Sequence, residues 1–327
     1  MKRSKEIFVK VRFIITEKDE RRGFGVLKNM KARWLSLLLV MVLLSSLLVG
    51  CGAKKEAAPP VPEEKQAVEQ VDIRDIADEY FAQMPENNRI IKSPALKERI
   101  DAGDTDILVI DIRPPEVYAK GHIKGAVNIP FRKMHEYLDK LPADKEIIIA
   151  CVTGQTAGQA IAILNMYGYD AKSLYLGFDK GWVGENDFPV DTAEYKLPQD
   201  VTPAKPDPAI AQILKDYFAN LPDNNNIIDP EELQKKIDAS EDIMIVDIRA
   251  PEDYAEGHIK GAVNIPFRKI NEHFDEFAQD KPVYVYCYTG QTAGQAIAVL
   301  KTLGIDAYSV KGGFKLGWAP AGLPVEK

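Results

Sequence analysis

The chain repeats a large part of its own sequence at a spacing of 136 residues. A period this long indicates duplicated domains, because the repeats of solenoids and propellers are only about 20–50 residues long. We therefore expect two copies of one folding unit. The matching stretches are GHIKGAVNIPFRK at 121–133 and 257–269, TGQTAGQAIA at 153–162 and 289–298, and Asp-Ile-Arg at 111–113 and 247–249.

Within each copy, short apolar runs alternate with segments of helical spacing. In the first copy, residues 107–110 and 147–150 are continuous and rich in β-branched side chains, as buried parallel strands are. Residues 94–102 and 156–167 have helical spacing, and Gly168 is a helix stop signal. This alternation predicts an α/β domain, in which helices cover both faces of a mainly parallel sheet.

The region between the copies predicts the domain boundaries. Residues 196–208 (KLPQDVTPAKPDP) contain four prolines and no apolar periodicity, so we interpret them as a linker. The first copy is then residues 73–195 and the second copy is residues 209–327. A length of 327 residues is sufficient for two such domains.

An apolar run lies near the N-terminus. Residues 35–49 form an uncharged stretch of 15 residues behind Lys31 and Arg33. This length suits the apolar region of a secretory signal peptide, here residues 30–50, whereas a membrane-spanning helix needs about 20 apolar residues. A short membrane anchor with a cytoplasmic tail is the alternative.

The run ends in Leu48-Val49-Gly50-Cys51, which resembles a bacterial lipobox. The resemblance implies that Cys51 is lipidated and that the mature protein is held on the extracytoplasmic face of the membrane, in the bacterial cell envelope. Two or more acyl chains would hold the protein stably. Residues 51–72 are rich in Ala, Pro, Glu and Lys and are interpreted as a flexible tether.

Residues 1–29 fit poorly with this scheme, because a secretory signal begins close to its basic region. Met30 is well placed as the true start, so we interpret residues 1–29 as a start-site artefact, with a cytoplasmic tail as the alternative. Arg21-Arg22 also matches a twin-arginine signal loosely.

Charge is distributed unevenly along the chain. Residues 1–50 carry a net charge of +7, whereas the remainder holds 31 basic and 45 acidic residues, a net charge of −14. A net charge this negative on residues 51–327 argues against nucleic acid or anionic lipid headgroups as partners.

The chain has three cysteines, Cys51, Cys151 and Cys287, and the last two occupy equivalent positions in the copies. Three cysteines spread this widely do not form a disulfide framework. A Cys151–Cys287 bridge remains an alternative, but equivalent positions favour two separate sites.

Each of these two cysteines lies between a predicted strand and a predicted helix. In α/β sheets, sites gather where strands end at their carboxyl edge. The amides of a loop that enters a helix form an anion-binding nest, which would lower the pKa of the thiol and make it nucleophilic. A lone cysteine can also be a small buried hydrophobe, but two at equivalent junctions favour a site.

At this point the sequence resembles a rhodanese domain in each copy. The resemblance rests on Asp-Ile-Arg after a strand, then GHIKGAVNIP, then Cys-x-x-Gly before a helix, then Gly-Phe and Gly-Trp near the end. It covers residues 90–200 and 225–325. It implies a five-stranded α/β domain whose cysteine accepts a sulfane sulfur as a persulfide and passes it to a thiol acceptor, which is a small molecule or a protein. It implies no metal and no organic cofactor.

We interpret His122 and His258 as structural, because a histidine in a turn far from the cysteine is usually a hydrogen-bonding residue. For other residues, the resemblance implies roles in the reaction. The sulfur carriers would be Cys151 and Cys287, and supporting residues would surround their loops. The cradle residues are Val152, Thr153, Gly154, Gln155, Thr156 and Ala157 in the first copy and Tyr288, Thr289, Gly290, Gln291, Thr292 and Ala293 in the second. The supporting residues are Asp111 and Arg113 in the first copy and Asp247 and Arg249 in the second. Arg132 and Arg268, in the repeated Phe-Arg-Lys, are further supporting candidates that could cover the pockets, with a solvated surface face as the alternative.

The two loops depart from the pattern of thiosulfate sulfurtransferases, which place Arg or Lys in the loop. CVTGQT and CYTGQT carry no charge, and their sixth residues are Thr156 and Thr292. Thiosulfate is a dianion, and charged hydrogen bonds are about twice as strong as neutral ones, so we expect poor activity with thiosulfate. A phosphatase is disfavoured too, because its Cys-x5-Arg loop would need arginine where Ala157 and Ala293 stand.

The sequence thus predicts a membrane-anchored sulfurtransferase or persulfide carrier. The alternative is a non-catalytic rhodanese-like binding module of the cell envelope, since fold alone does not establish activity.

Overall fold

The computed structural model describes residues 71–277 and 280–327. They belong to one compact unit that spans residues 68–327. The predicted start-site segment 1–29, the signal peptide 30–50 and Cys51 lie outside the described residues, as does the tether up to residue 70. Over the two described ranges, no helix has both the length and the apolar character needed to cross a membrane.

The first copy forms a five-stranded sheet in the order β1-β5-β4-β2-β3, in which every pair of neighbours is parallel. The strands are β1 (Ile90–Ile91), β2 (Ile107–Asp111), β3 (Val127–Asn128), β4 (Glu146–Ala150) and β5 (Ala171–Leu174). The helices are α3 (Ile73–Ala82), α4 (Ser93–Asp101), α5 (Pro115–Tyr118), α6 (Gln155–Tyr167) and the short helices η1 (Phe131–Glu136) and η2 (Gly177–Gly184).

The second copy repeats this topology, with a parallel sheet in the order β6-β10-β9-β7-β8. Its strands are β6 (Ile227–Ile228), β7 (Met244–Asp247), β8 (Ala262–Asn264), β9 (Val283–Tyr286) and β10 (Ala307–Val310). Its helices are α7 (Pro208–Ala219), α8 (Pro230–Asp238), α9 (Pro251–Glu256), α10 (Gln291–Thr302), η3 (Phe267–Glu276) and η4 (Gly313–Trp318).

The predicted fold class is confirmed. The two apolar runs of the first copy are the central strands β2 and β4, and the two segments of helical spacing are α4 and α6. Ile147, Ile148 and Ile149 are all fully buried, because a strand in the middle of a parallel sheet is covered on both faces. That is why the run is continuously apolar rather than alternating.

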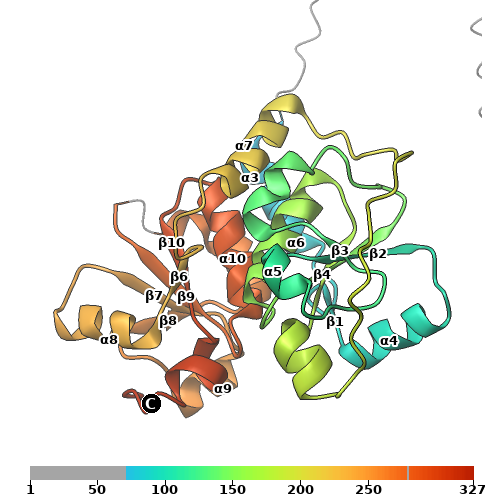
Figure 1. The fold of residues 1–327 in the computed structure, drawn as a ribbon. Helices are drawn as coiled ribbons and strands as arrows, with labels where there is room; N and C mark the ends of the chain where they lie inside the picture. The colour runs from blue at the N-terminus through green and yellow to red at the C-terminus, as the bar shows by residue number, and fades with distance from the viewer. Residues whose placement is uncertain (1–70, 278–279) are drawn as a thin grey trace, which may run out of the picture. The chain divides into compact units, whose positions relative to one another are not determined.

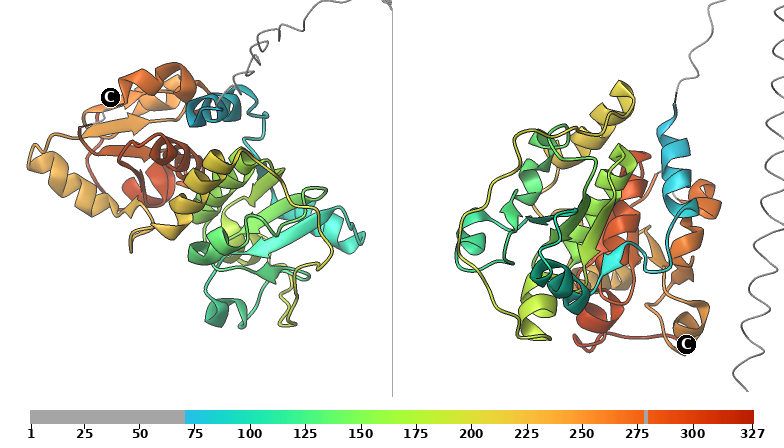
Figure 2. Two further views of the ribbon diagram at one scale, coloured as in Figure 1. Left: turned by 90° about the horizontal axis from the view of Figure 1, so that it is seen from above. Right: turned by 90° about the vertical axis from the view of Figure 1, so that its right-hand side faces the viewer.

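Helices α6 and α10 pack side by side, with one sheet to either side of the pair (Figures 1 and 2). Glycines allow the close approach. A Cβ atom at Gly158 would lie 2.1 Å from the carbonyl oxygen of Gln291, and one at Gly294 would lie 2.3 Å from that of Gln155. Each helix therefore fits its neighbour only because these positions have no side chain.

The first helix of each copy packs on the other copy. Helix α3 contacts η3, and α7 contacts η1. The ring centroids of Phe81 and Phe267 are 5.6 Å apart, and those of Phe131 and Phe218 are 5.5 Å apart, both edge to face. One hydrophobic core consequently runs through both copies. The sequence predicted two domains joined by a linker but not this shared core.

Candidate active site

Cys151 follows the last residue of β4, and Cys287 follows the last residue of β9. Each cysteine is at the carboxyl edge of its sheet, as expected. The backbone amides of Gly154 and Ala157 donate to the Sγ of Cys151 at 3.1 and 3.3 Å. In the second copy, the corresponding amides lie 3.1 and 3.4 Å from the Sγ of Cys287. Each sulfur is thus held in a cradle of N–H donors, a geometry that stabilises negative charge on it.

Gly154 gives the first loop its shape. It adopts a φ of +93°, in the left-handed region that favours glycine, and it directly precedes α6. This conformation turns the amide of Gly154 towards Cys151, and Gly290 has the same role in the second copy with a φ of +88°.

Cys151 is 3% exposed, and this burial raises the pKa of its thiol above the ordinary value. Hydrogen bonds from the Thr156 hydroxyl and from the loop amides act in the opposite direction but do not outweigh desolvation. The sequence-based expectation of a lowered pKa is therefore wrong for Cys151. The loop does supply the expected donors, but the depth of the sulfur below the surface is not visible in a local motif.

In a Cys287→Ser variant, alkylation of Cys151 by iodoacetamide is expected to speed up with pH throughout the neutral range. Because the pKa of Cys151 is raised, the thiolate is the minor form at neutral pH, and its fraction grows about tenfold per pH unit below the pKa. The rate, followed by intact mass, should reach no plateau below about pH 8.5. A rate that is constant from about pH 6 to 7.5 would show a depressed pKa instead.

The repeated Gly-Phe pair supports each loop from below. The amide of Phe178 donates to the carbonyl of Cys151 at 2.6 Å, and that of Phe314 donates to the carbonyl of Cys287 at 2.8 Å. A Cβ atom at Gly177 would lie 2.4 Å from the carbonyl oxygen of Cys151. The glycine therefore permits direct contact between the two backbones.

Asp111 and Arg113 form a buried ion pair beneath the loop. Nη2 of Arg113 donates to Oδ2 of Asp111 at 2.6 Å, and Nε donates to both carboxylate oxygens at 3.0 Å. The guanidinium also lies 3.8 Å from the centroid of the Phe178 ring and donates to Asp179 at 3.2 Å. Asp111 thus orients Arg113, and Arg113 contacts the segment that holds the loop.

The second copy repeats most of this arrangement. Nη2 of Arg249 donates to Oδ2 of Asp247 at 2.6 Å, and its guanidinium lies 4.0 Å from the centroid of the Phe314 ring. The position of Asp179 is taken by Lys315, whose Nζ lies 4.9 Å from the centroid of the Tyr288 ring. The two sites are therefore similar but not identical in charge.

A cavity of about 850 Å³ opens at Cys151 and is lined by both copies. Arg132 lines it and donates to the carbonyls of Leu221 and Pro222 in the second copy at 2.9 and 2.5 Å. The symmetric Arg268 donates to Asn88 and Pro85 in the first copy. First-copy residues lining the cavity include Arg113, Val152, Thr153, Gln155 and Thr156, and second-copy residues are Asn224, Asn225, Ile227, Asp229 and Lys311.

The two loops differ only at their second residue, which is Val152 in the first copy and Tyr288 in the second. Val152 is 43% exposed. The hydroxyl of Tyr288 donates to Oδ2 of Asp253 at 2.5 Å and accepts from the amide of Ala250 at 3.2 Å. Tyr288 is therefore held towards α9, whereas Val152 makes no comparable polar contact.

Gln155 and Gln291, which the sequence groups with the cradles, extend their side chains into the opposite copy. Nε2 of Gln155 donates to Oγ of Ser309 at 2.8 Å, and Nε2 of Gln291 donates to Oγ of Ser173 at 2.7 Å. Both glutamines are almost fully buried. Their side chains thus connect the cysteine loops across the interface, a contact that sequence reasoning missed.

His122 lies not in a turn, as the sequence suggested, but in an isolated antiparallel β-bridge with Asp191. Its ring stacks on that of Tyr118 with centroids 3.7 Å apart, and its two nitrogens lie 2.9 Å from the carbonyls of Tyr118 and Ala193. In the second copy, Nδ1 of His258 lies 3.1 Å from the carbonyl of Tyr254. These contacts are to backbone carbonyls and an aromatic ring, and Tyr118 and Tyr254 belong to helices α5 and α9.

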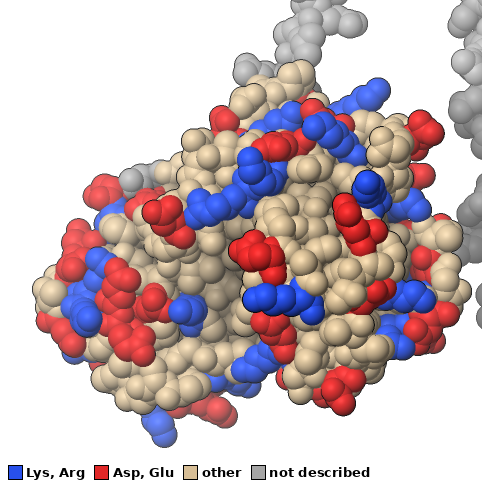
Figure 3. Space-filling model, viewed as in Figure 1, with Lys and Arg blue, Asp and Glu red and all other residues tan. Residues whose placement is uncertain are grey.

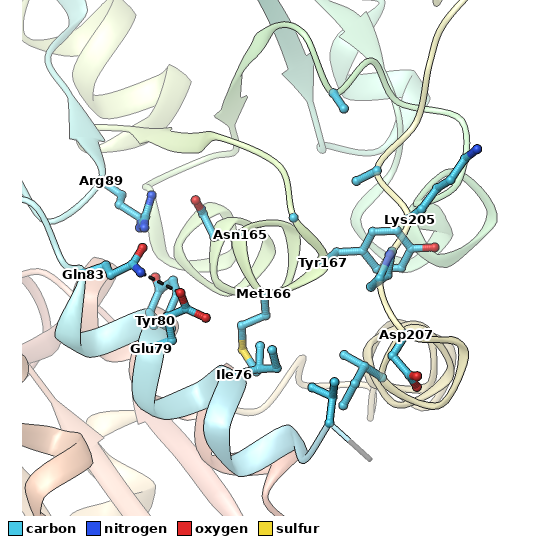
Figure 4. Close-up of a pocket in the computed structure, with 16 residues that line it drawn as sticks. Ile76, Glu79, Tyr80, Gln83, Arg89, Asn165, Met166, Tyr167, Lys205 and Asp207 are labelled. Carbon is cyan, nitrogen blue, oxygen red and sulfur yellow. Dashed lines mark hydrogen bonds between the residues drawn. The ribbon is translucent and has the colours of Figure 1, made fainter. Parts of the chain in front are cut away.

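A second cavity, of about 550 Å³, lies between α3, the C-terminal end of α6 and the start of α7 (Figure 4). Neither cysteine lines this cavity. On its wall, the side chain of Gln83 donates a hydrogen bond of 2.6 Å to Glu79, drawn as a dashed line in Figure 4.

Among the residues that the structure places, no group of three or more His, Cys, Asp or Glu side chains could hold a metal ion. On the face drawn in Figure 3, acidic and basic side chains are interspersed.

The fold and the site define a duplicated α/β protein with one amide-cradled cysteine in each half. The chain belongs to the rhodanese-like family. The model of the rhodanese-like domain matches residues 93–185 and 229–319, more than half of the chain. Helices α3 and α7, which exchange contacts between the copies, lie outside both matches.

Three of the similar proteins each match a stretch about as long as one copy. A protein named sulfurtransferase from Allochromatium vinosum is 36% identical over 101 residues, which cover 31% of this chain and 94% of the relative. Thiosulfate sulfurtransferase PspE of Escherichia coli is 38% identical over 72 residues, covering 21% and 69% respectively. A rhodanese-like domain protein of Staphylococcus aureus, of known structure, is 32% identical with a TM-score of 0.28 and covers 31% of this chain and 98% of its own.

Proposed function

We propose that the protein transfers sulfane sulfur by way of a persulfide formed on Cys151 and on Cys287. The observation that carries this proposal is the cradle itself. In each copy, two backbone N–H groups point at one cysteine sulfur at the carboxyl edge of the sheet. The relatives named as sulfurtransferases support a sulfur-transfer reaction in general.

The reaction would take place in two displacements. The cysteine thiolate attacks the sulfane sulfur of the donor, a new S–S bond forms, and the donor's remaining fragment leaves with the electron pair of the broken bond. An acceptor thiolate then attacks the terminal sulfur, and the cysteine leaves as a thiolate. The protein is regenerated without an external oxidant, and the loop amides stabilise negative charge on sulfur at both stages.

The neutral cradles favour donors that carry less charge than thiosulfate. The groups presented to sulfur are backbone amides and the Thr156 hydroxyl in the first loop and backbone amides in the second. A dianion placed there would find no arginine or lysine within the loop to pair with, and Arg or Lys bonds to anions are among the strongest hydrogen bonds. We therefore propose persulfides or polysulfides as donors and low activity with thiosulfate.

We propose further that the protein acts in the bacterial cell envelope, held to the membrane through lipidated Cys51. This proposal rests on the lipobox-like sequence at the end of the apolar run and on the polar tether that follows it.

In protein whose Cys51 is lipidated or replaced with serine, treatment with a polysulfide is expected to add one sulfur atom to each of Cys151 and Cys287. Intact mass should show two added sulfurs in the wild type, one in Cys151→Ser and one in Cys287→Ser. The double variant should gain none, and a reducing thiol should remove every added sulfur. Treatment with a panel of persulfide, polysulfide and thiosulfate donors that leaves the wild-type mass unchanged would refute the proposal.

A further inference from the structure

Gln155 holds a short segment of the second copy against the first cysteine loop. Its Nε2 donates to Oγ of Ser309 at 2.8 Å and to the carbonyl of Val310 at 3.1 Å. Its Oε1 accepts from the amide of Gly312 at 3.1 Å. The residue enclosed by these contacts is Lys311, so the backbone position of Lys311 is fixed by the residue that begins α6.

Lys311 lines the same cavity as Cys151, and its side chain is 65% exposed. Its Nζ lies 2.8 Å from Oδ1 of Asp229, which is 58% exposed. An ion pair this exposed is weak, so the ammonium can exchange Asp229 for an anion that enters the cavity.

Both arginines of the cavity are engaged more closely. Arg113 is buried against Asp111, and Arg132 donates to two backbone carbonyls of the second copy. Lys133 forms an exposed ion pair with Glu136 at 2.8 Å, much like that of Lys311 with Asp229. Of the two exposed lysines, Lys311 is the one whose backbone Gln155 holds against the cysteine loop, so it is the cation best placed to bind an anion beside Cys151.

Resting on the sulfur-transfer function proposed above, we propose that Lys311 is a specificity residue of the Cys151 site. It binds the carboxylate of a persulfide donor such as an amino-acid persulfide, while the sulfane sulfur reaches Cys151. The second copy thereby supplies the positive charge that the loop of the first copy lacks. The apolar residues Ile112, Phe131 and Ile227 line the rest of the cavity and suit an uncharged donor body.

The equivalent position in the other half carries no charge. Gln291 donates to Ser173 and to the carbonyl of Leu174 at 3.0 Å and accepts from the amide of Leu176 at 3.3 Å. These contacts enclose Tyr175 in the way that those of Gln155 enclose Lys311. The contribution of Lys311 is therefore specific to one cysteine.

The test uses the full chain with Cys51→Ser and Cys287→Ser, so that sulfur uptake is measured at Cys151 alone. The donors are the persulfides of cysteine and of cysteine methyl ester, which differ in the carboxylate. Lys311→Met should slow uptake from cysteine persulfide by about five- to tenfold and change uptake from the ester by less than about twofold. Lys311→Arg should retain the preference for the carboxylate donor, and Asp229→Asn should strengthen it.

Equal slowing with both donors, or no slowing with either, would overturn the assignment. Lys311 also lines a smaller cavity, of about 360 Å³, together with Thr153 of the first loop and Thr289 of the second. Sulfur uptake must therefore be measured separately at Cys151 and at Cys287. In a Cys151→Ser background, Lys311→Met should leave uptake at Cys287 unchanged, and an equal loss there would contradict a role confined to Cys151. If Cys151 gains sulfur from no donor while Lys311 is intact, the proposed function itself fails.

Discussion

Gly158→Ala is expected to destabilise the protein by about 2–3 kcal/mol, although the same change in an exposed helix stabilises by about 1 kcal/mol. The added Cβ would lie 2.1 Å from the carbonyl oxygen of Gln291, which belongs to the backbone of α10 and cannot rotate away. The two helices must then separate, and the shared core must open around them. Gly294→Ala should have a similar effect, because its Cβ would lie 2.3 Å from the carbonyl oxygen of Gln155.

Urea unfolding of the wild type and these variants measures the effect. Gly304→Ala is the matched control. It also replaces a glycine with alanine in the second copy, but its Cβ would have no atom within 4 Å, and only the cost of a φ of +84° remains. If Gly158→Ala were as stable as the wild type, the close approach of α6 and α10 would be wrong.

The interface matters for the chemistry because α6 begins where the first cysteine loop ends. Gln155 is the first residue of α6 and contacts Ser309, while Gln291 is the first residue of α10 and contacts Ser173. Separation of the helices would remove both contacts. We therefore expect the two copies to act as one structural unit with two sites.

The fold could be predicted from the sequence because its signals are local. Continuous apolar strands, helical spacing and the exact repeat define two parallel α/β units, and the structure contains them. The Gly-Phe pairs also lie where a cysteine loop needs support. Spacing alone places Cys151 and Cys287 at strand ends, since the strand-to-helix junction is read directly from the sequence.

The contacts between the copies could not be predicted in the same way. The hydroxyl of Tyr80 donates to Gln295, and that of Tyr217 donates to Gln159, each at 2.7 Å, across long sequence separations. These glutamines belong to the exact repeat TGQTAGQ but lie beyond the predicted cradles, which end at Ala157 and Ala293. No local pattern assigned them a partner in the other copy.

Charge at the Cys151 site was also only partly predictable. The loop CVTGQT is uncharged, and the sequence offered Arg132 as a residue that could cover it. In the structure, Arg132 lines the cavity but donates to the backbone of the second copy, and Lys311 joins it from a distant segment. A composite cavity depends on how two units pack, and that packing follows no local pattern.

Loss of both cysteines is expected to abolish sulfur transfer, the largest effect on activity that we predict. Serine preserves the size of the side chain, and the cradle amides can donate to its oxygen, so the fold should be retained. A serine hydroxyl does not form a stable persulfide equivalent, so neither displacement can occur. Each single variant should keep the transfer supported by its remaining cysteine.

The most direct test measures the steady-state transfer of sulfur from a polysulfide to a thiol acceptor, with the release of sulfide as the readout. It compares the wild type, both single variants and the double variant. Thermal unfolding of each variant serves as the control for folding. We expect the double variant to fall by about a hundredfold or more, to the uncatalysed rate, with both single variants above it. A folded double variant that transfers sulfur at the wild-type rate would contradict a role for Cys151 and Cys287 as sulfur carriers.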